Sequence, residues 1–94
     1  MMSQIPLELK KVAPEKIDQE ILRVAMIAEL DAVNLYEQMA AMTEDQNLKK
    51  VLLDIAKEEK THVGEFQAML LKTDQEQVAE LEHGKKEVEE LTGA

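Results

Sequence analysis

The sequence has 94 residues, enough for one small domain, and it contains no cysteine. Disulfides and thiolate metal sites are therefore excluded, and the lack of cysteine suits a cytoplasmic protein. A net charge of −9 disfavours nucleic acid and anionic membrane surfaces as partners and favours metal cations. No apolar stretch approaches the length of a transmembrane helix, and no secretory signal pattern is visible.

The first predicted helix runs from about Pro14 to Met42. Residues 1–13 before it are expected to form a short irregular arm, and proline suits the first position of a helix. Within the helix, apolar residues recur at steps of three and four, which is the spacing of one helical face. Two polar residues, Glu29 and Tyr36, interrupt one of the apolar stripes. The apolar members of that stripe are Leu22, Met26, Val33 and Ala40.

A second helix is expected over about residues 44–72. The four residues 43–46 have a capping-box pattern with Thr43 as the cap, which predicts a very short turn. A short connection makes the two helices antiparallel neighbours. The apolar stripe of the second helix also contains two ionisable residues, Glu59 and His62. Its apolar members are Leu48, Leu52, Ile55, Phe66 and Met69.

Residues 73–94 are expected to form a short third helix and a frayed tail. Asp74 begins another capping pattern. Gly84 should interrupt or bend the helix because glycine is a poor helix former, and His83 beside it should be exposed to solvent. The predicted fold class is therefore all-α, with an antiparallel two-helix hairpin over residues 14–72 and a short C-terminal helix.

Glu59 and His62 form a Glu-x-x-His unit on one face of a helix, and these donors suit Fe, Mn or Zn. A carboxylate in an apolar stripe is costly to bury unless it is paired or binds a metal. Glu29 lies 14 residues before Thr43, and Glu59 and His62 lie 16 and 19 residues after it. In a hairpin that turns at Thr43, all three therefore lie within roughly 8 Å in height. The sequence predicts a metal site at this level.

Several alternatives stay open at this point. Glu59 and His62 could be a structural pair that sets the register of a helical interface. Glu58 competes with Glu59 because it lies four residues before His62, although it lies off the apolar stripe. Tyr36 is either a core aromatic or a neighbour of the site that hydrogen-bonds a ligand or takes part in redox chemistry. Three further acids are either a secondary or access site for cations or ordinary surface residues: Asp31, Glu37 and Glu65.

The chain holds half of a known type of metal site. Di-iron sites of ferritin-like bundles use a Glu from each of two helices and a Glu-x-x-His from each of the other two. A two-fold dimer would supply both missing halves. A chain this short also buries too little surface to be more than marginally stable alone. We therefore expect the hairpin to dimerise into a ferritin-like four-helix bundle.

At these residues the sequence resembles the encapsulated ferritins, ferritin-like proteins housed inside encapsulin shells. Residues 27–39 and 58–66 resemble the first and second helices of that family, and the archaeal, hyperthermophile type is most similar. The resemblance covers nearly the whole chain. It implies a ferroxidase that oxidises Fe(II) to Fe(III) with dioxygen at a di-iron centre. The implied site residues are the iron ligands Glu29, Glu59 and His62, with Tyr36 beside them.

The resemblance also implies partners. Homodimers would associate into a ring of five dimers, a decamer, inside an encapsulin nanocompartment in the cytoplasm, and the shell would hold the stored iron. Relatives reach the shell by a C-terminal targeting peptide or by fusion to the shell protein. No convincing targeting peptide follows Leu91, so we expect the chain to be either truncated or the amino-terminal domain of a fusion. Some relatives carry a second acidic metal site, of which Asp31 matches one position while Ala28 and Leu35 replace others.

Two rival functions remain at this stage. One is a rubrerythrin-like peroxide reductase, although the chain lacks the cysteines of a rubredoxin domain. The other is a non-enzymatic helical scaffold or adaptor whose polar core residues only set register. Iron oxidation by dioxygen is the function that we expect.

Overall fold

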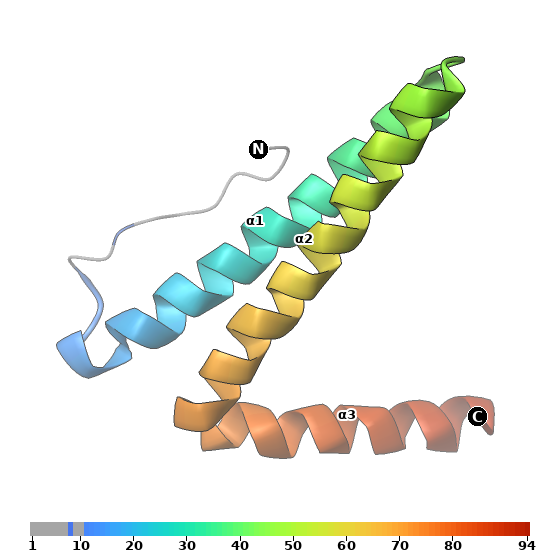
Figure 1. Ribbon diagram of the computed structural model, residues 1–94. Coiled ribbons are helices and arrows are strands. Elements are labelled where there is room, and N and C mark those ends of the chain that lie inside the picture. Colours follow the sequence, from blue (N-terminus) through green and yellow to red (C-terminus); the bar gives the residue numbers. More distant parts are fainter. Residues whose placement is uncertain (1–7, 9–10) are drawn as a thin grey trace.

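A computed structural model describes Glu8 and residues 11–94 of the chain, and every regular element in this part is helical. The elements in order are the 3-10 turn η2 (Pro14–Lys16) and the helices α1 (Ile17–Met42), α2 (Gln46–Thr73) and α3 (Gln75–Thr92). Helices α1 and α2 form an antiparallel hairpin, and α3 turns sharply away from the end of α2 (Figure 1). The predicted all-α hairpin with a third helix is confirmed. None of the described helices is long and apolar enough to cross a membrane.

The first turn of the predicted first helix is a 3-10 turn instead of an α-helix. The backbone N–H of Lys16 donates to the carbonyl of Ala13 at 2.8 Å, and the α-helix begins only at Ile17. Pro14 occupies the first position of this turn, where its missing N–H leaves no bond unmade. The predicted arm over residues 1–13 lies mostly outside the described residues.

Asp45 caps the start of α2, and the prediction that Thr43 is the cap is wrong. Asp45 Oδ1 accepts the backbone N–H groups of Asn47 at 2.9 Å and Leu48 at 3.1 Å. Thr43 Oγ1 accepts only the N–H of Asp45, at 3.1 Å, which tightens the turn. A carboxylate satisfies two helix-start N–H groups and carries the negative charge that the helix dipole favours. Helix α2 therefore begins slightly later than the sequence pattern predicted.

A single residue, Asp74, joins α2 to α3. Its Oδ1 accepts the N–H of Gln77 at 3.0 Å, which confirms the predicted cap, and its Oδ2 lies 3.5 Å from Nη1 of Arg23 on α1. The side-chain amide of Gln19 donates to the carbonyl of Thr73 at 3.1 Å. The beginning of α1 thus holds the junction at which α3 changes direction.

Helix α3 runs through Gly84 without a break, so the predicted interruption is wrong. Glycine costs only about 1 kcal/mol relative to alanine in a helix, a preference that its context can override. The tail is also ordered: Gly93 has φ 76°, and its N–H donates to the carbonyl of Glu89 at 2.8 Å. A left-handed glycine is the usual end of a helix. Two of the three residues that were predicted to fray, Thr92 and Gly93, thus form the last residue of the helix and its cap.

The hairpin has a thin core. In the described part of the chain, the buried hydrophobic residues are Val33, Ala40, Ala56 and Leu70. Many larger apolar side chains stay exposed, including Ile21, Leu35, Met42, Leu48, Val51 and Met69. Residues that the sequence pattern assigned to a core are thus open to solvent in a single chain.

Candidate metal centre

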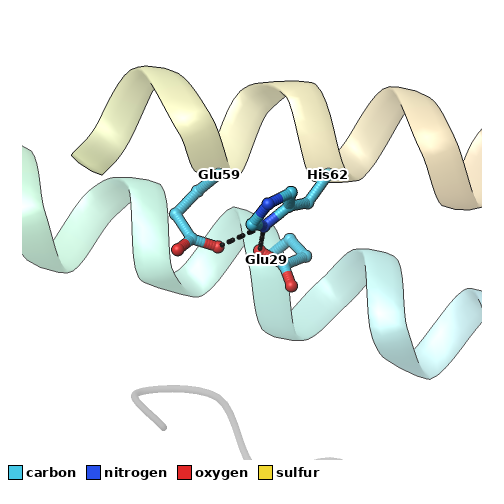
Figure 2. Close-up of side chains that lie close together, drawn as sticks. All are labelled: Glu29, Glu59 and His62. Carbon is cyan, nitrogen blue, oxygen red and sulfur yellow. Dashed lines mark hydrogen bonds and ion pairs between the residues drawn. The ribbon is translucent and has the colours of Figure 1, made fainter. Parts of the chain in front are cut away.

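Three ionisable side chains converge between the two helices of the hairpin. Glu29 comes from α1 and Glu59 and His62 come from α2, and the side chains point toward one another (Figure 2). His62 Nδ1 lies 3.3 Å from Oε2 of Glu29 and 3.3 Å from Oε2 of Glu59. One ligand atom of each residue lies within 4.8 Å of the other two. The structure thus brings together the three residues that the sequence singled out.

Local structure explains this meeting. The three-residue spacing puts Glu59 and His62 on the same face of α2, one turn apart. The short turn capped by Asp45 keeps the helices antiparallel and in register, so Glu29 on α1 reaches the same height. Glu58 is exposed, whereas Glu59 is half-buried. The competing assignment to Glu58 therefore loses support from the geometry.

The electrostatics of the cluster favour a cation. A neutral imidazole has one N–H, so the single Nδ1 of His62 cannot fully satisfy two carboxylates. The side chains of Glu29 and Glu59 are only 21% and 19% exposed, so water screens their mutual repulsion poorly. A divalent cation among these atoms would be the largest local charge and would offset that repulsion. Imidazole and carboxylate donors together fit Fe, Mn or Zn.

The cluster borders an open cavity of about 370 Å³. Its lining residues are Glu29, His62, Glu65, Phe66 and Met69. The side chain of His62 is 43% exposed, and Met69 is 59% exposed. Met69, a member of the apolar stripe predicted for the second helix, is thus open to solvent beside the cluster, whereas Phe66 is half-buried. Glu65, a predicted secondary residue, lies at the rim of this cavity.

The other predicted residues lie outside the cluster. Among the His, Asp and Glu side chains of the described residues, the group whose ligand atoms could hold one metal ion does not include Asp31. Asp31 and Tyr36 are half-buried on α1, and Tyr36 is two turns after Glu29. Glu37 forms an ion pair with Lys60 at 3.3 Å on the surface, which favours its interpretation as a surface acid. The structure therefore supports a site of three donors per chain.

A second Glu-x-x-His unit on α3 escaped the sequence reasoning. His83 is exposed, as predicted, but its Nδ1 lies 3.2 Å from Oε2 of Glu80 and its Nε2 lies 3.1 Å from Oε1 of Glu87. The signal was present in the sequence, because residues three and four apart on a helix are neighbours. It was missed because His83 lies off the sparse apolar face that Val78, Leu81, Val88 and Leu91 give this helix, so it interrupts no apolar stripe.

Comparison with known proteins finds a matching family model and two curated relatives of the same kind. A family model described as EncFtn-like matches residues 5–83. A ferritin-like-encapsulin shell fusion protein of Pyrococcus furiosus is 68% identical over 74 residues, which are 79% of this chain and 21% of that protein. The encapsulin nanocompartment cargo protein EncC of Myxococcus xanthus is 35% identical over 68 residues, which are 72% of this chain and 50% of that protein. The chain thus spans half or less of the length of these curated relatives.

A solved structure agrees with the sequence comparisons. The crystal structure of the encapsulated ferritin domain from Pyrococcus furiosus matches with a TM-score of 0.80 and 54% sequence identity. The match covers 100% of this chain and 90% of that chain. The hairpin that carries the cluster, together with α3, is therefore similar to a fold that has been determined by experiment.

Proposed function

This chain belongs to the EncFtn-like family, and on that premise we propose that it is a ferroxidase. It oxidises Fe(II) to Fe(III) with dioxygen at a di-iron site that two copies of the chain share. The observation that carries this proposal is the convergence of Glu29, Glu59 and His62 from two helices within 4.8 Å. Two carboxylates and one imidazole are the donors of half a ferritin-like di-iron site.

The donor set fits iron but is incomplete in one chain. Three protein ligands on an open surface leave a metal ion exposed to water and to other reactions. A two-fold axis beside the cavity would double every donor and give four carboxylates and two imidazoles. The partner would also cover exposed apolar residues around the cavity, such as Met69. A second copy of the chain would thus both complete the metal site and bury the exposed apolar residues beside it.

The total surface of the chain supports this dimer. Its accessible surface is 7288 Å², whereas a compact monomer of 10.7 kDa exposes about 5,500 Å². The excess on each chain is larger than the roughly 800 Å² that each partner buries in a standard interface, and it suits the more extensive interface of an obligate dimer. We infer that the four-helix bundle forms only when two hairpins associate.

Each residue has a definite task in the proposed site. The carboxylates of Glu29 and Glu59 hold the iron ions and neutralise their charge, and His62 supplies a nitrogen donor from each chain. Oxidation of two Fe(II) ions would release two electrons, which dioxygen would accept together with two protons from water to leave as hydrogen peroxide. Tyr36 lies two turns from Glu29 on α1, where its hydroxyl is suited to hydrogen-bond a carboxylate of the assembled site. Burial within the bundle limits access of water and competing oxidants.

The proposal extends to the setting of the reaction. The relatives named above include a fusion to an encapsulin shell and a cargo protein of an encapsulin nanocompartment. We propose that this chain also acts inside an encapsulin shell, in the cytoplasm, with its dimers arranged as a ring of five. An open ring encloses no storage cavity, so the shell would hold the oxidised iron. The shell protein is then the main partner besides further copies of the chain.

Anaerobic loading with Fe(II) followed by addition of dioxygen tests the reaction. We expect Fe(III) to form rapidly when dioxygen is added. Optical absorbance in a stopped-flow instrument measures the rate of Fe(III) formation, and an oxygen electrode measures the consumption of dioxygen. Rapid oxidation by hydrogen peroxide with a negligible reaction with dioxygen would instead indicate a peroxide reductase. If neither oxidant reacts faster with Fe(II) in the presence of the protein than with free Fe(II), the ferroxidase proposal fails and the scaffold interpretation is favoured.

Iron should also drive dimer formation, because each chain holds half of the ligands. We expect native mass spectra recorded without oxygen to show more dimer, or multiples of it, after Fe(II) is added, with two iron ions per dimer. The Glu59→Ala variant is the matched control and should not respond to Fe(II). A monomer that binds two iron ions tightly would contradict the shared site.

A further inference from the structure

We propose that α3 carries a second metal site, in which Nε2 of His83 and the carboxylate of Glu87 bind a divalent first-row transition-metal ion. Glu80 completes the site by holding the imidazole in place. These three residues lie on one face of α3, at spacings of three and four residues, and on a different helix from the cluster around His62. The inference therefore does not depend on the ferroxidase reaction.

The hydrogen bonding of His83 prepares one nitrogen for a metal. Oε2 of Glu80 lies 3.2 Å from Nδ1, close enough to accept the Nδ1–H in the tautomer that carries the proton there. Metal-binding histidines commonly donate their other ring N–H to a carboxylate, which sets both the tautomer and the orientation. In that tautomer Nε2 carries the lone pair and lies 3.1 Å from Oε1 of Glu87. A cation between these two electron-rich atoms, either a second ring proton or a metal ion, would offset their repulsion.

The distance between these two donors fits a metal ion. Bonds from Zn²⁺ to a histidine nitrogen and to a carboxylate oxygen are about 2.0–2.2 Å long. Two such bonds place the donors about 3.0 Å apart at an octahedral angle and about 3.4 Å apart at a tetrahedral angle. The observed 3.1 Å lies between these values. Little movement of either side chain is required, because both stand one turn apart on a regular helix.

The setting predicts a weak and rapidly exchanging site. The side chains of Glu80, His83 and Glu87 are 63%, 62% and 60% exposed, so water fills the remaining metal positions. Imidazole with carboxylate selects Zn²⁺, Fe²⁺, Ni²⁺ or Cu²⁺ over Ca²⁺ and Mg²⁺, which prefer sites made of oxygen alone. The negative charge of the chain raises the concentration of such ions near the helix.

The test uses the full chain with His62→Ala, which leaves His83 as the remaining one of the two histidines. Nitrogen-15 NMR of the imidazole ring during a Zn²⁺ titration then reports on His83 alone. We expect the Nε2 signal to shift with added Zn²⁺ while Nδ1 keeps its proton. Circular dichroism of the same samples shows that the helices remain folded. Unchanged ring signals at a large molar excess of Zn²⁺ would overturn the proposal.

Variants on α3 identify the ligands. Glu87→Gln should weaken Zn²⁺ binding about tenfold, since it removes a charged donor. Glu80→Gln should weaken it less, because the amide oxygen still accepts the Nδ1–H. Glu82→Gln is the matched control, because it removes the same charge from a position about 100° around the helix from His83. It should leave the affinity for Zn²⁺ unchanged. If Glu87→Gln and Glu82→Gln weakened Zn²⁺ binding equally, the effect would be general charge attraction, and the proposed site would be overturned.

Discussion

Replacing Glu29, Glu59 or His62 with alanine is expected to abolish rapid Fe(II) oxidation. Each substitution removes two ligands from a site that contains every residue twice. Loss of a partner that merely orients a ligand commonly costs 10–100-fold in metal affinity or activity, so loss of the ligands themselves should cost about 100-fold or more. Initial rates of Fe(III) formation, measured by stopped-flow absorbance at equal protein concentration, give the comparison.

The exposed neighbour Glu58 provides the matched control for these variants. Glu58→Ala changes the charge as Glu59→Ala does, but its side chain lies on the outer side of α2 and should leave the rate near that of the parent. The reverse result, an active Glu59→Ala and an inactive Glu58→Ala, would move the ligand assignment to Glu58. Tyr36→Phe keeps the aromatic ring, so slower oxidation with unchanged iron binding would assign a role to the hydroxyl.

The double substitution Glu59→Leu with His62→Leu separates function from stability. If these residues are needed for metal binding and not for packing, the metal-free protein should lose no stability when they are replaced by leucine. Replacing a buried polar pair by apolar residues of similar volume is often neutral or stabilising. The side chains of His62 and Glu59 are 43% and 19% exposed in the single chain, and the proposed dimer would bury them further. The metal-free variant should therefore melt at or above the temperature of the metal-free parent while iron binding and oxidation disappear. Thermal melts by circular dichroism and iron titrations measure the two effects.

The scaffold interpretation predicts a different outcome for the same variant. There, Glu59 and His62 would set the register of an interface, and their loss would scramble the oligomer. Native mass spectra of the metal-free parent and variant distinguish these outcomes. A variant that keeps the parent's oligomeric state supports the ferroxidase, whereas one that changes its stoichiometry without metal would contradict it.

Much of the hairpin and the core of the site could be predicted from local rules. Helical periodicity identified α1 and α2, and the count of residues from the turn placed Glu29 at the height of Glu59 and His62. The errors concern features where several local interactions compete. Asp45 instead of Thr43 caps α2, and α3 continues through Gly84. In both cases a side-chain or helix bonding pattern outweighed a residue preference of about 1 kcal/mol.

The sequence by itself determined which residues share a helical face and a height, because a period of 3.6 residues and a rise of 1.5 Å are properties of the local backbone. Only the tertiary structure decided that two carboxylates turn to the same nitrogen of His62 and that Met69 borders an open cavity. The contact of Arg23 with Asp74 at the start of α3, 51 residues apart in the chain, is likewise a feature of the tertiary structure alone. Rotamers and contacts between distant residues depend on how whole helices pack, which no pattern within a single helix encodes.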